Sequence, residues 1–337
     1  MKTESVVIEK PFKAVLKETD IDEKAIGCDE ILLKTRYSLV SAGTELAIYR
    51  GTEDWAPLPF YPGYAAVGEV LQTGEAVKDV RTGEMIFCYC GHSQFSRASV
   101  GHVIVKFPQE YDARGIVFTR IAAVSITALR VSDVQLGDWA AVFGLGLVGN
   151  LAAQLFVLAG AKVIGIDVSE KRLELAKQCN VEYTINPQKE DVKEMVLELT
   201  GGKGVNSVVE ATGVPSVVER AFEIAAPRGE VILLGSPRGQ CQGDITGLLN
   251  CVHQWGKGCV TLKGAHEWRY PIKPSQGCKH SIQRNCEILV ELIAKKKLII
   301  EPLITHIESP ANVQQVYQGL LNKPNEYVGV LFDWEKV

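Results

Sequence analysis

The chain has 337 residues, with 36 lysines and arginines against 40 aspartates and glutamates, and a formal net charge of −4 at pH 7. At roughly 100–200 residues per domain, this length predicts about two domains. Hydrophobic residues make up 46% of the chain and charged residues 23%, which excludes disorder as a description of the whole chain. Because the net charge is slightly acidic, no nucleic-acid partner is expected. We expect a small-molecule substrate instead.

The sequence shows neither a membrane span nor an export signal. No apolar run approaches the roughly 20 residues that cross a bilayer, so no membrane association is expected. The N-terminal residues MKTESVVIEKPFK carry charges where a signal peptide needs an apolar stretch. The 9 cysteines are odd in number, widely spaced and without a C-x-x-C pair, which indicates reduced thiols. A cytoplasmic location is therefore expected.

Residues 1–115 contain short apolar or β-branched runs separated by Gly, Pro and Asp. This pattern is typical of strands joined by turns. The predicted strands are residues 5–10, 30–40, 65–72, 84–90 and 102–107. We therefore predict a compact, β-rich domain in this part of the chain.

From about residue 116, apolar strand-like runs alternate with segments of helical period. The predicted strands are 140–143, 162–168, 183–186, 206–211 and 230–235, and the predicted helices are 147–161, 169–179, 191–200 and 216–226. Ser169 is the predicted N-cap of the second of these helices. Such alternation implies right-handed βαβ units around a parallel sheet that is apolar on both faces. The pattern changes again after residue 268, where we predict helices at 278–297 and 312–321.

The strongest motif is the G-x-G-x-x-G run from Gly144 to Gly149, which follows a predicted strand and opens a predicted helix. Gly144 permits the tight turn, Gly146 lets a pyrophosphate approach the backbone, and Gly149 lets helix and strand pack closely. Leu147 and Val148 complete the loop at the helix N-terminus, where free N–H groups favour phosphate. The motif predicts a dinucleotide site, with a non-binding glycine turn as the alternative.

Asp167 ends the next strand, 18 residues after Gly149 (167 minus 149), close to the spacing of about 20 residues for a ribose-binding carboxylate. A carboxylate there accepts hydrogen bonds from a ribose 2′-hydroxyl and repels a 2′-phosphate. The sequence therefore predicts NAD rather than NADP. Arg172 either stacks near the adenine or is a solvated helix residue.

Taken together, these segments resemble the medium-chain dehydrogenase/reductase superfamily, which includes zinc alcohol dehydrogenases. The matching segments are SLVSAGTELAIYRG, YPGYAAVGEV, VQLGDWAAVFGLGLVG, NSVVEATG, GEVILLGS and PLITHIESPANVQQVYQGL. The resemblance implies an α/β architecture, with a GroES-like β-rich catalytic domain (1–118), a Rossmann NAD-binding domain with a doubly wound parallel sheet (119–265), and a C-terminal segment (266–337) that returns to the catalytic domain. It also implies cofactor contacts at Thr212, Gly235 and Ser236.

The zinc ligands of that family are absent here. Ala42 stands at the first ligand position, Tyr64 at the second, and Thr119 or Arg120 at the third. Catalytic zinc needs three Cys, His or carboxylate ligands, so we expect no metal. The resemblance also implies that the four-cysteine lobe of the family is deleted near residues 88–100. Zinc-free relatives include quinone and enoyl reductases, and the pattern S-x-G-T-E…Y-R-G…P-G-Y-x-x-V-G is more similar to a branch of bacteriochlorophyllide hydroxyethyl dehydrogenases.

Without a metal, a polar side chain must polarise the substrate oxygen and move a proton. Thr44 matches the family's proton-passing hydroxyl, or is a turn residue. Tyr64 donates a hydrogen bond, or its ring fills the vacated ligand position. Arg120 orients the substrate, pairs with Glu45, or is an exposed helix arginine, while Glu45 supports the site from behind. His92 titrates in the useful range, or is a hydrogen-bonded structural histidine.

We expect Tyr49, Trp268 and Tyr270 to line the substrate pocket, although the last two could instead cover a subunit interface. The sequence predicts a zinc-independent, NAD(H)-dependent oxidoreductase that interconverts a secondary alcohol, such as a polyol, sugar or cyclitol derivative, and a ketone. The alternatives are an NADPH-dependent quinone or enoyl reductase, and a non-catalytic nucleotide-binding protein on the same scaffold. The resemblance also implies a homodimer or homotetramer joined through Rossmann-sheet edges.

Overall fold

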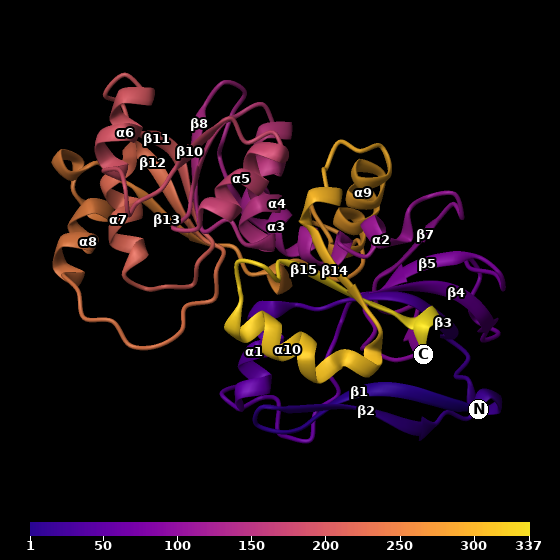
Figure 1. The fold of residues 1–337 in the computed structure, drawn as a ribbon. Coiled ribbons are helices and arrows are strands. Elements are labelled where there is room, and N and C mark those ends of the chain that lie inside the picture. The colour runs from indigo at the N-terminus through magenta and orange to yellow at the C-terminus, as the bar shows by residue number, and fades with distance from the viewer. The chain divides into compact units, whose positions relative to one another are not determined.

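The computed structural model describes residues 1–337, except for the side chain of Lys24. It separates the chain into two compact units that each gather stretches far apart in sequence (Figure 1). Unit 1 consists of Met1–Arg120, Tyr270–Lys296 and Leu303–Val337, and unit 2 consists of Ile121–Arg269 and Lys297–Pro302. The C-terminal part of the chain is therefore shared, because Lys297–Pro302 leaves unit 1 and packs with unit 2.

Unit 1 is rich in β-structure, as predicted. Its strands are β1 (Lys2–Lys10), β2 (Lys13–Asp20), β3 (Glu30–Leu39), β4 (Ala66–Thr73), β5 (Met85–Cys88), β6 (Phe95–Ser99), β7 (Ile104–Phe107), β14 (Ile304–Glu308) and β15 (Gly329–Asp333). Seven of them form one sheet in the order β14-β15-β3-β4-β5-β7, with β6 paired to β3, while β1 and β2 form a separate hairpin. Strands from the C-terminal part of the chain thus complete a sheet that begins near the N-terminus.

Four helices accompany these strands in unit 1. They are α1 (Ala42–Arg50), α2 (Ala113–Ile116), α9 (Ile282–Ala294) and α10 (Val313–Asn322). The sequence patterns did not predict α1, which packs Ile48 and Tyr49 into a core shared with Tyr317 of α10. The helix ends at Gly51, whose φ of +71° lies in the left-handed region that glycine adopts without strain.

Unit 2 contains a parallel sheet with helices over both faces. Its strands are β8 (Trp139–Phe143), β9 (Lys162–Ile166), β10 (Tyr183–Ile185), β11 (Val205–Glu210), β12 (Ala225–Leu233) and β13 (Thr261–Gly264). Its helices are α3 (Thr119–Val131), which starts in unit 1, α4 (Leu147–Leu158), α5 (Glu170–Gln178), α6 (Val192–Leu199), α7 (Val217–Ile224) and α8 (Ile245–His253).

The strand order is β10-β9-β8-β11-β12-β13, and every neighbouring pair is parallel. This is the order of a doubly wound Rossmann sheet, so the predicted fold class is confirmed. Alternate residues of β8 enter two different cores, with Val142 in one and Ala141 and Phe143 in the other. A strand covered on both faces explains why its sequence is apolar without alternation.

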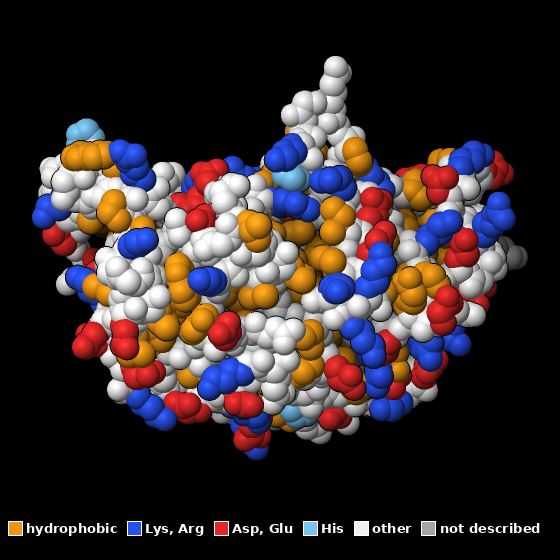
Figure 2. Space-filling model, turned by 90° about the horizontal axis from the view of Figure 1, so that it is seen from above, with side chains coloured by type: hydrophobic (Ala, Val, Ile, Leu, Met, Phe, Trp, Pro, Cys, Tyr) orange, Lys and Arg blue, Asp and Glu red, His pale blue; other side chains and the backbone are white. Residues whose placement is uncertain are grey.

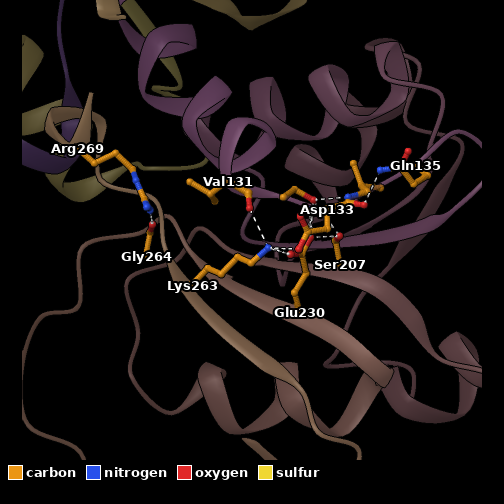
Figure 3. Close-up of polar contacts among 10 residues, drawn as sticks. Val131, Asp133, Gln135, Ser207, Glu230, Lys263, Gly264 and Arg269 are labelled. Carbon is orange, nitrogen blue, oxygen red and sulfur yellow. Dashed lines mark hydrogen bonds and ion pairs between the residues drawn. The ribbon is translucent and has the colours of Figure 1, made fainter. Parts of the chain in front are cut away.

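A partly buried polar cluster ties the edge strand β13 to the rest of unit 2 (Figure 3). The Nζ atom of Lys263 lies 2.6 Å from Oε2 of Glu230 on β12 and 2.5 Å from Oδ2 of Asp133 just after α3. The other carboxylate oxygen of Glu230 accepts hydrogen bonds of 2.5 Å from the hydroxyls of Ser132 and Ser207. We call Lys263, Glu230, Asp133, Ser132 and Ser207 the edge cluster.

No helix among the described residues combines the length and the apolarity needed to cross a bilayer. Figure 2 shows lysine, arginine, aspartate and glutamate side chains interspersed over one face of the molecule. All 9 cysteines are free thiols, of which Cys88, Cys90, Cys179 and Cys286 are buried.

Candidate functional site

The backbone of the glycine loop in unit 2 requires glycine at two of the three motif positions. Gly144 has a φ of +84°, and a Cβ at this position would come within 2.7 Å of Cγ2 of Thr212. A Cβ on Gly149 would lie 1.7 Å from the carbonyl oxygen of Gly144, so only glycine lets α4 approach β8 this closely. A Cβ on Gly146 would meet nothing within 4 Å, which leaves open space before the N-terminus of α4. The close packing explains why glycine is needed at positions 144 and 149, while the approach of a pyrophosphate to Gly146 stays a prediction.

Asp167 follows β9 and connects directly to this loop. Its Oδ2 atom accepts a hydrogen bond of 2.7 Å from the backbone N–H of Leu145, and its Oδ1 atom accepts one of 2.8 Å from the N–H of Ser169. Ser169 occupies the predicted N-cap position of α5, but its side chain makes no capping hydrogen bond. Arg172 places Nη1 3.7 Å from Oδ2 of Asp167, so a cation stands beside the predicted ribose-binding carboxylate.

The other predicted cofactor residues gather at the carboxyl ends of β11 and β12. The backbone N–H of Thr212 donates to Oε1 of Glu210 at 2.6 Å, and its hydroxyl donates to the same oxygen. A Cβ on Gly235 would lie 2.4 Å from the backbone nitrogen of Gly213, which itself packs against the carbonyl of Ser236. Glu210 was not predicted as part of the site. Its place directly before the A-T-G turn is the signal that could have found it.

In unit 1, the structure brings Tyr64 and Arg120 together. The guanidinium carbon of Arg120 lies 4.6 Å from the ring centroid of Tyr64 and 4.4 Å from that of Tyr89, within the range of cation–π contacts. The phenol of Tyr64 donates a hydrogen bond to Oγ of Ser41, the N-cap residue of α1. Arg120 is only 6% exposed, which contradicts its interpretation as an exposed helix arginine. Tyr89 and Ser41 were not predicted.

The surroundings of Tyr64 keep its phenol protonated at neutral pH. Burial raises the pKa of Tyr64, and the nearby negative charge of Glu45 raises it further. The cation of Arg120 and the hydrogen bonds with Ser41 and Thr44 act in the opposite direction, but the pKa stays above its ordinary value of 10.0. The phenol is therefore a hydrogen-bond donor at neutral pH.

Glu45 and His92 form a buried pair beside this group. The two side chains are 0% and 1% exposed, and Nε2 of His92 lies 3.0 Å from Oε2 of Glu45. Oε1 of Glu45 accepts a hydrogen bond of 2.8 Å from the backbone N–H of Ser41, and Oε2 accepts one of 2.6 Å from the hydroxyl of Tyr317. Glu45 thus supports the first turn of α1 from inside the unit, and Tyr317 was not predicted.

The structure contradicts the prediction that Tyr49 lines a substrate pocket. Tyr49 is 1% exposed and its ring stacks on that of Tyr317, with centroids 5.1 Å apart. Its hydroxyl donates to the carbonyl of Phe12 at 2.8 Å, so it belongs to the core between α1 and α10. The sequence did not predict the burial of Tyr49 because it did not predict helix α1, which carries this residue. Trp268 lies in unit 2 and is 51% exposed, whereas Tyr270 lies in unit 1.

The donor set at the family's zinc-ligand positions does not fit zinc. Ala42 has no donor atom, Arg120 carries a permanent positive charge, and Tyr64 keeps its proton. Among the described residues, no group of three or more His, Cys, Asp or Glu side chains could hold a metal ion.

Comparisons with known proteins place this geometry in a family. Residues 27–125 match the alcohol dehydrogenase GroES-like domain, and residues 148–268 match the zinc-binding dehydrogenase domain. The chain belongs to the alcohol dehydrogenase-like medium-chain dehydrogenase/reductase superfamily of oxidoreductases, whose members use a nicotinamide dinucleotide. Unit 1 is accordingly a GroES-like domain and unit 2 a Rossmann domain.

Three similar proteins illustrate this membership. D-guloside 3-dehydrogenase of Escherichia coli K12 is 24% identical over 340 residues, which cover 92% of this chain and 95% of that protein. A putative zinc-binding dehydrogenase of Sinorhizobium meliloti bound to NADP superposes with a TM-score of 0.83 at 20% identity, covering 99% of both chains. An alcohol dehydrogenase of Escherichia coli CFT073 complexed with NADH gives a TM-score of 0.83 at 19% identity, covering 98% of this chain and 99% of that one.

Proposed function

We propose that the protein is a zinc-independent, NAD(H)-dependent oxidoreductase that interconverts a secondary alcohol and a ketone. The observation that carries this proposal is the contact between Arg120 and Tyr64 at positions where the family has metal ligands. A polyol, sugar or cyclitol derivative is the proposed substrate class, supported by the similarity to D-guloside 3-dehydrogenase. The zinc-free branch that includes bacteriochlorophyllide hydroxyethyl dehydrogenases remains the proposed place within the superfamily.

The bound dinucleotide supplies the hydride chemistry at the substrate carbon. The protein side chains then have to handle the proton and the charge on the substrate oxygen. Tyr64 holds that proton: its protonated phenol donates to a ketone oxygen during reduction, and its deprotonated form accepts the alcohol proton during oxidation. Arg120 stabilises the negative charge that develops on the substrate oxygen or on the phenol oxygen of Tyr64. Thr44 forms a hydrogen bond with the phenol and orients it.

The cofactor preference rests on Asp167 and its neighbour. The carboxylate disfavours a 2′-phosphate, which supports NAD. Arg172, with Nη1 3.7 Å from that carboxylate, is the observation that makes NADPH the competing cofactor, because a guanidinium can bind a phosphate. The glycine loop, with Leu147, Val148, Thr212, Gly235 and Ser236, would hold either dinucleotide.

A substrate and cofactor panel tests the proposal. Purified protein is assayed with polyols, inositols and sugars in the presence of NAD, and with quinones and enones in the presence of NADPH. We expect turnover of a hydroxylated compound with NAD and a larger thermal shift with NADH than with NADPH. Turnover of only quinones or enones would contradict the proposal. Tight NADH binding without any turnover would instead support a non-catalytic nucleotide-binding protein.

Two copies are proposed to associate through the exposed edge of the Rossmann sheet. Strand β13 ends the sheet order, and Leu262 on it is 39% exposed. The adjoining helix α8 exposes 65% of Ile245 and 57% of Leu249. Light scattering should show a dimer or tetramer that Leu249→Lys dissociates, while Leu136→Lys, at a position 85% exposed, leaves it intact. A wild-type monomer would contradict this association.

The free thiols support a cytoplasmic location, which fractionation of the native cells tests.

A further inference from the structure

The buried pair of Glu45 and His92 belongs to a longer chain of hydrogen bonds. The indole N–H of Trp334 lies 2.9 Å from Oγ of Ser38, and the same oxygen lies 2.8 Å from Nδ1 of His92. An indole only donates, so the hydroxyl proton of Ser38 is available to Nδ1 of His92. The Nε2 atom of His92 then carries its proton towards Glu45. In this arrangement every member of the chain has a hydrogen-bond partner.

The chain of hydrogen bonds is dry and reaches Tyr64 through one residue. Ser38 and Tyr317 are 0% exposed and Trp334 is 3% exposed, so water does not compete for these groups. At its other end, Glu45 accepts the backbone N–H of Ser41, and the side chain of Ser41 accepts the phenol proton of Tyr64. The position of the Ser41 oxygen is therefore set by the carboxylate that holds the Ser41 backbone.

Tyr64 also stands between two buried charges of opposite sign. The anion of Glu45 and the cation of Arg120 act on it in opposite directions. The titratable or charged groups around it are Glu45 from α1, Arg120 from the start of α3, Tyr317 from α10, and His92 from the loop after β5. Glu45 thus influences both the direction of the phenol hydrogen bond and the cost of removing the phenol proton.

We propose that Glu45 is a positioning residue for Tyr64, and that His92 and Tyr317 hold its carboxylate in place. Acting through Ser41, Glu45 orients the phenol, and its negative charge opposes the loss of the phenol proton. This inference rests on the proposed function, in which Tyr64 exchanges a proton with the substrate oxygen. A purely structural Glu45 would stabilise α1 without affecting the titration of Tyr64.

The first test measures the titration of Tyr64 in the resting protein and needs no substrate. Tyrosines labelled with 13C at Cζ are followed by NMR against pH, and the Tyr64 resonance is assigned by its loss in Tyr64→Phe. Glu45→Gln keeps the size and removes the charge, so the pKa of Tyr64 should fall. A pKa of Tyr64 that is unchanged in folded Glu45→Gln protein would overturn the inference.

The second test uses two stacked tyrosines as a matched pair. Tyr317→Phe removes the hydroxyl that donates to Glu45, whereas Tyr49→Phe removes one that donates to the carbonyl of Phe12. Both rings are buried between α1 and α10, so both variants should lose similar stability. We expect kcat/KM for the alcohol found in the panel to fall about tenfold in Tyr317→Phe and to stay unchanged in Tyr49→Phe. Equal losses in the two variants would overturn the inference.

The two tests separate this inference from the proposed function. If the pKa of Tyr64 falls in Glu45→Gln but Tyr64→Phe retains full turnover, the positioning role stands and the acid–base role of Tyr64 is wrong. If Tyr64→Phe loses turnover while Glu45→Gln leaves the pKa of Tyr64 unchanged, the proposed function stands and the positioning role is wrong.

Discussion

Two of the buried carboxylates, Glu45 and Glu230, have partners of different chemistry. Glu45 in unit 1 is 0% exposed and Glu230 in unit 2 is 4% exposed, and each accepts several hydrogen bonds. Glu230 pairs with the cation of Lys263, as Figure 3 shows, whereas Glu45 contacts Nε2 of His92. The ion pair of the edge cluster suits stability, whereas the charge of Glu45 acts on Tyr64, whose pKa it raises.

The charge state of the edge cluster supports this division. Burial acts to lower the pKa of Lys263, but its hydrogen bonds to Asp133 and Glu230 outweigh burial and raise it. A lysine whose pKa is raised on folding contributes stability that is fully present below its unfolded pKa and is lost as the pH rises through the folded value. The cluster is therefore stabilising throughout the neutral range.

The largest expected effect is on the stability of unit 2. Glu230→Gln leaves Lys263 without its buried anion and should lower the free energy of unfolding by about 2–3 kcal/mol. Urea unfolding measures this loss, and turnover per folded molecule should be unchanged. Glu291→Gln is the control, since the ion pair of Glu291 with Lys295 is exposed and should leave the midpoint unaltered. Equal midpoints for the two variants would show that the edge cluster does not stabilise the fold.

The next effect concerns unit 1 and should appear mainly in activity. Tyr64→Phe keeps the ring beside Arg120 but removes the hydroxyl, so kcat/KM should fall about a hundredfold or more. The loss of one hydrogen bond should cost about 1 kcal/mol of stability. Tyr37→Phe is a control at a half-buried phenol elsewhere in the unit. Undiminished turnover in Tyr64→Phe would reduce Tyr64 to a packing residue.

A smaller effect is expected at the cofactor site. Asp167→Ser should narrow the preference for NADH over NADPH about tenfold, because it removes the carboxylate that repels a 2′-phosphate. Fluorescence titrations with both cofactors measure the ratio. Asp191→Ser serves as the control, since Asp191 caps α6 and serine is also a good N-cap. An unaltered ratio in Asp167→Ser would leave Arg172 as the residue that decides the preference.

The pH dependence of turnover gives the most gradual signal. The pKa of Tyr64 is raised above its ordinary value, so the phenol is protonated at pH 7 and the deprotonated form grows about tenfold per pH unit. Alcohol oxidation should therefore accelerate from pH 7 towards pH 10, while ketone reduction stays level over the same range. Steady-state rates in both directions test this, and an oxidation rate that does not rise with pH would exclude Tyr64 as the base.

The sequence predicted those features of the fold and of the candidate site that depend on residues close together in the chain. The glycine loop, the alternation of strands and helices, and Asp167 all lie within one βαβ unit, where spacing determines geometry. The hydrogen bond from Tyr317 to Glu45 joins residues 272 positions apart, and that between His92 and Glu45 joins residues 47 apart. No local pattern shows such contacts, and the first of them depends on the return of α10 to unit 1. The return of α10 also explains why Tyr49 is a core residue, because its ring stacks on that of Tyr317.

Metal analysis combined with turnover tests the central claim most directly. Protein produced in zinc-supplemented medium is analysed by mass spectrometry for bound metals before and after treatment with a chelator, and both samples are assayed with the alcohol identified in the panel. An enzyme that relies on Tyr64 and Arg120 should contain no stoichiometric zinc and should keep its kcat after the treatment. One zinc ion per chain, with turnover lost on its removal and restored by its return, would contradict the proposal.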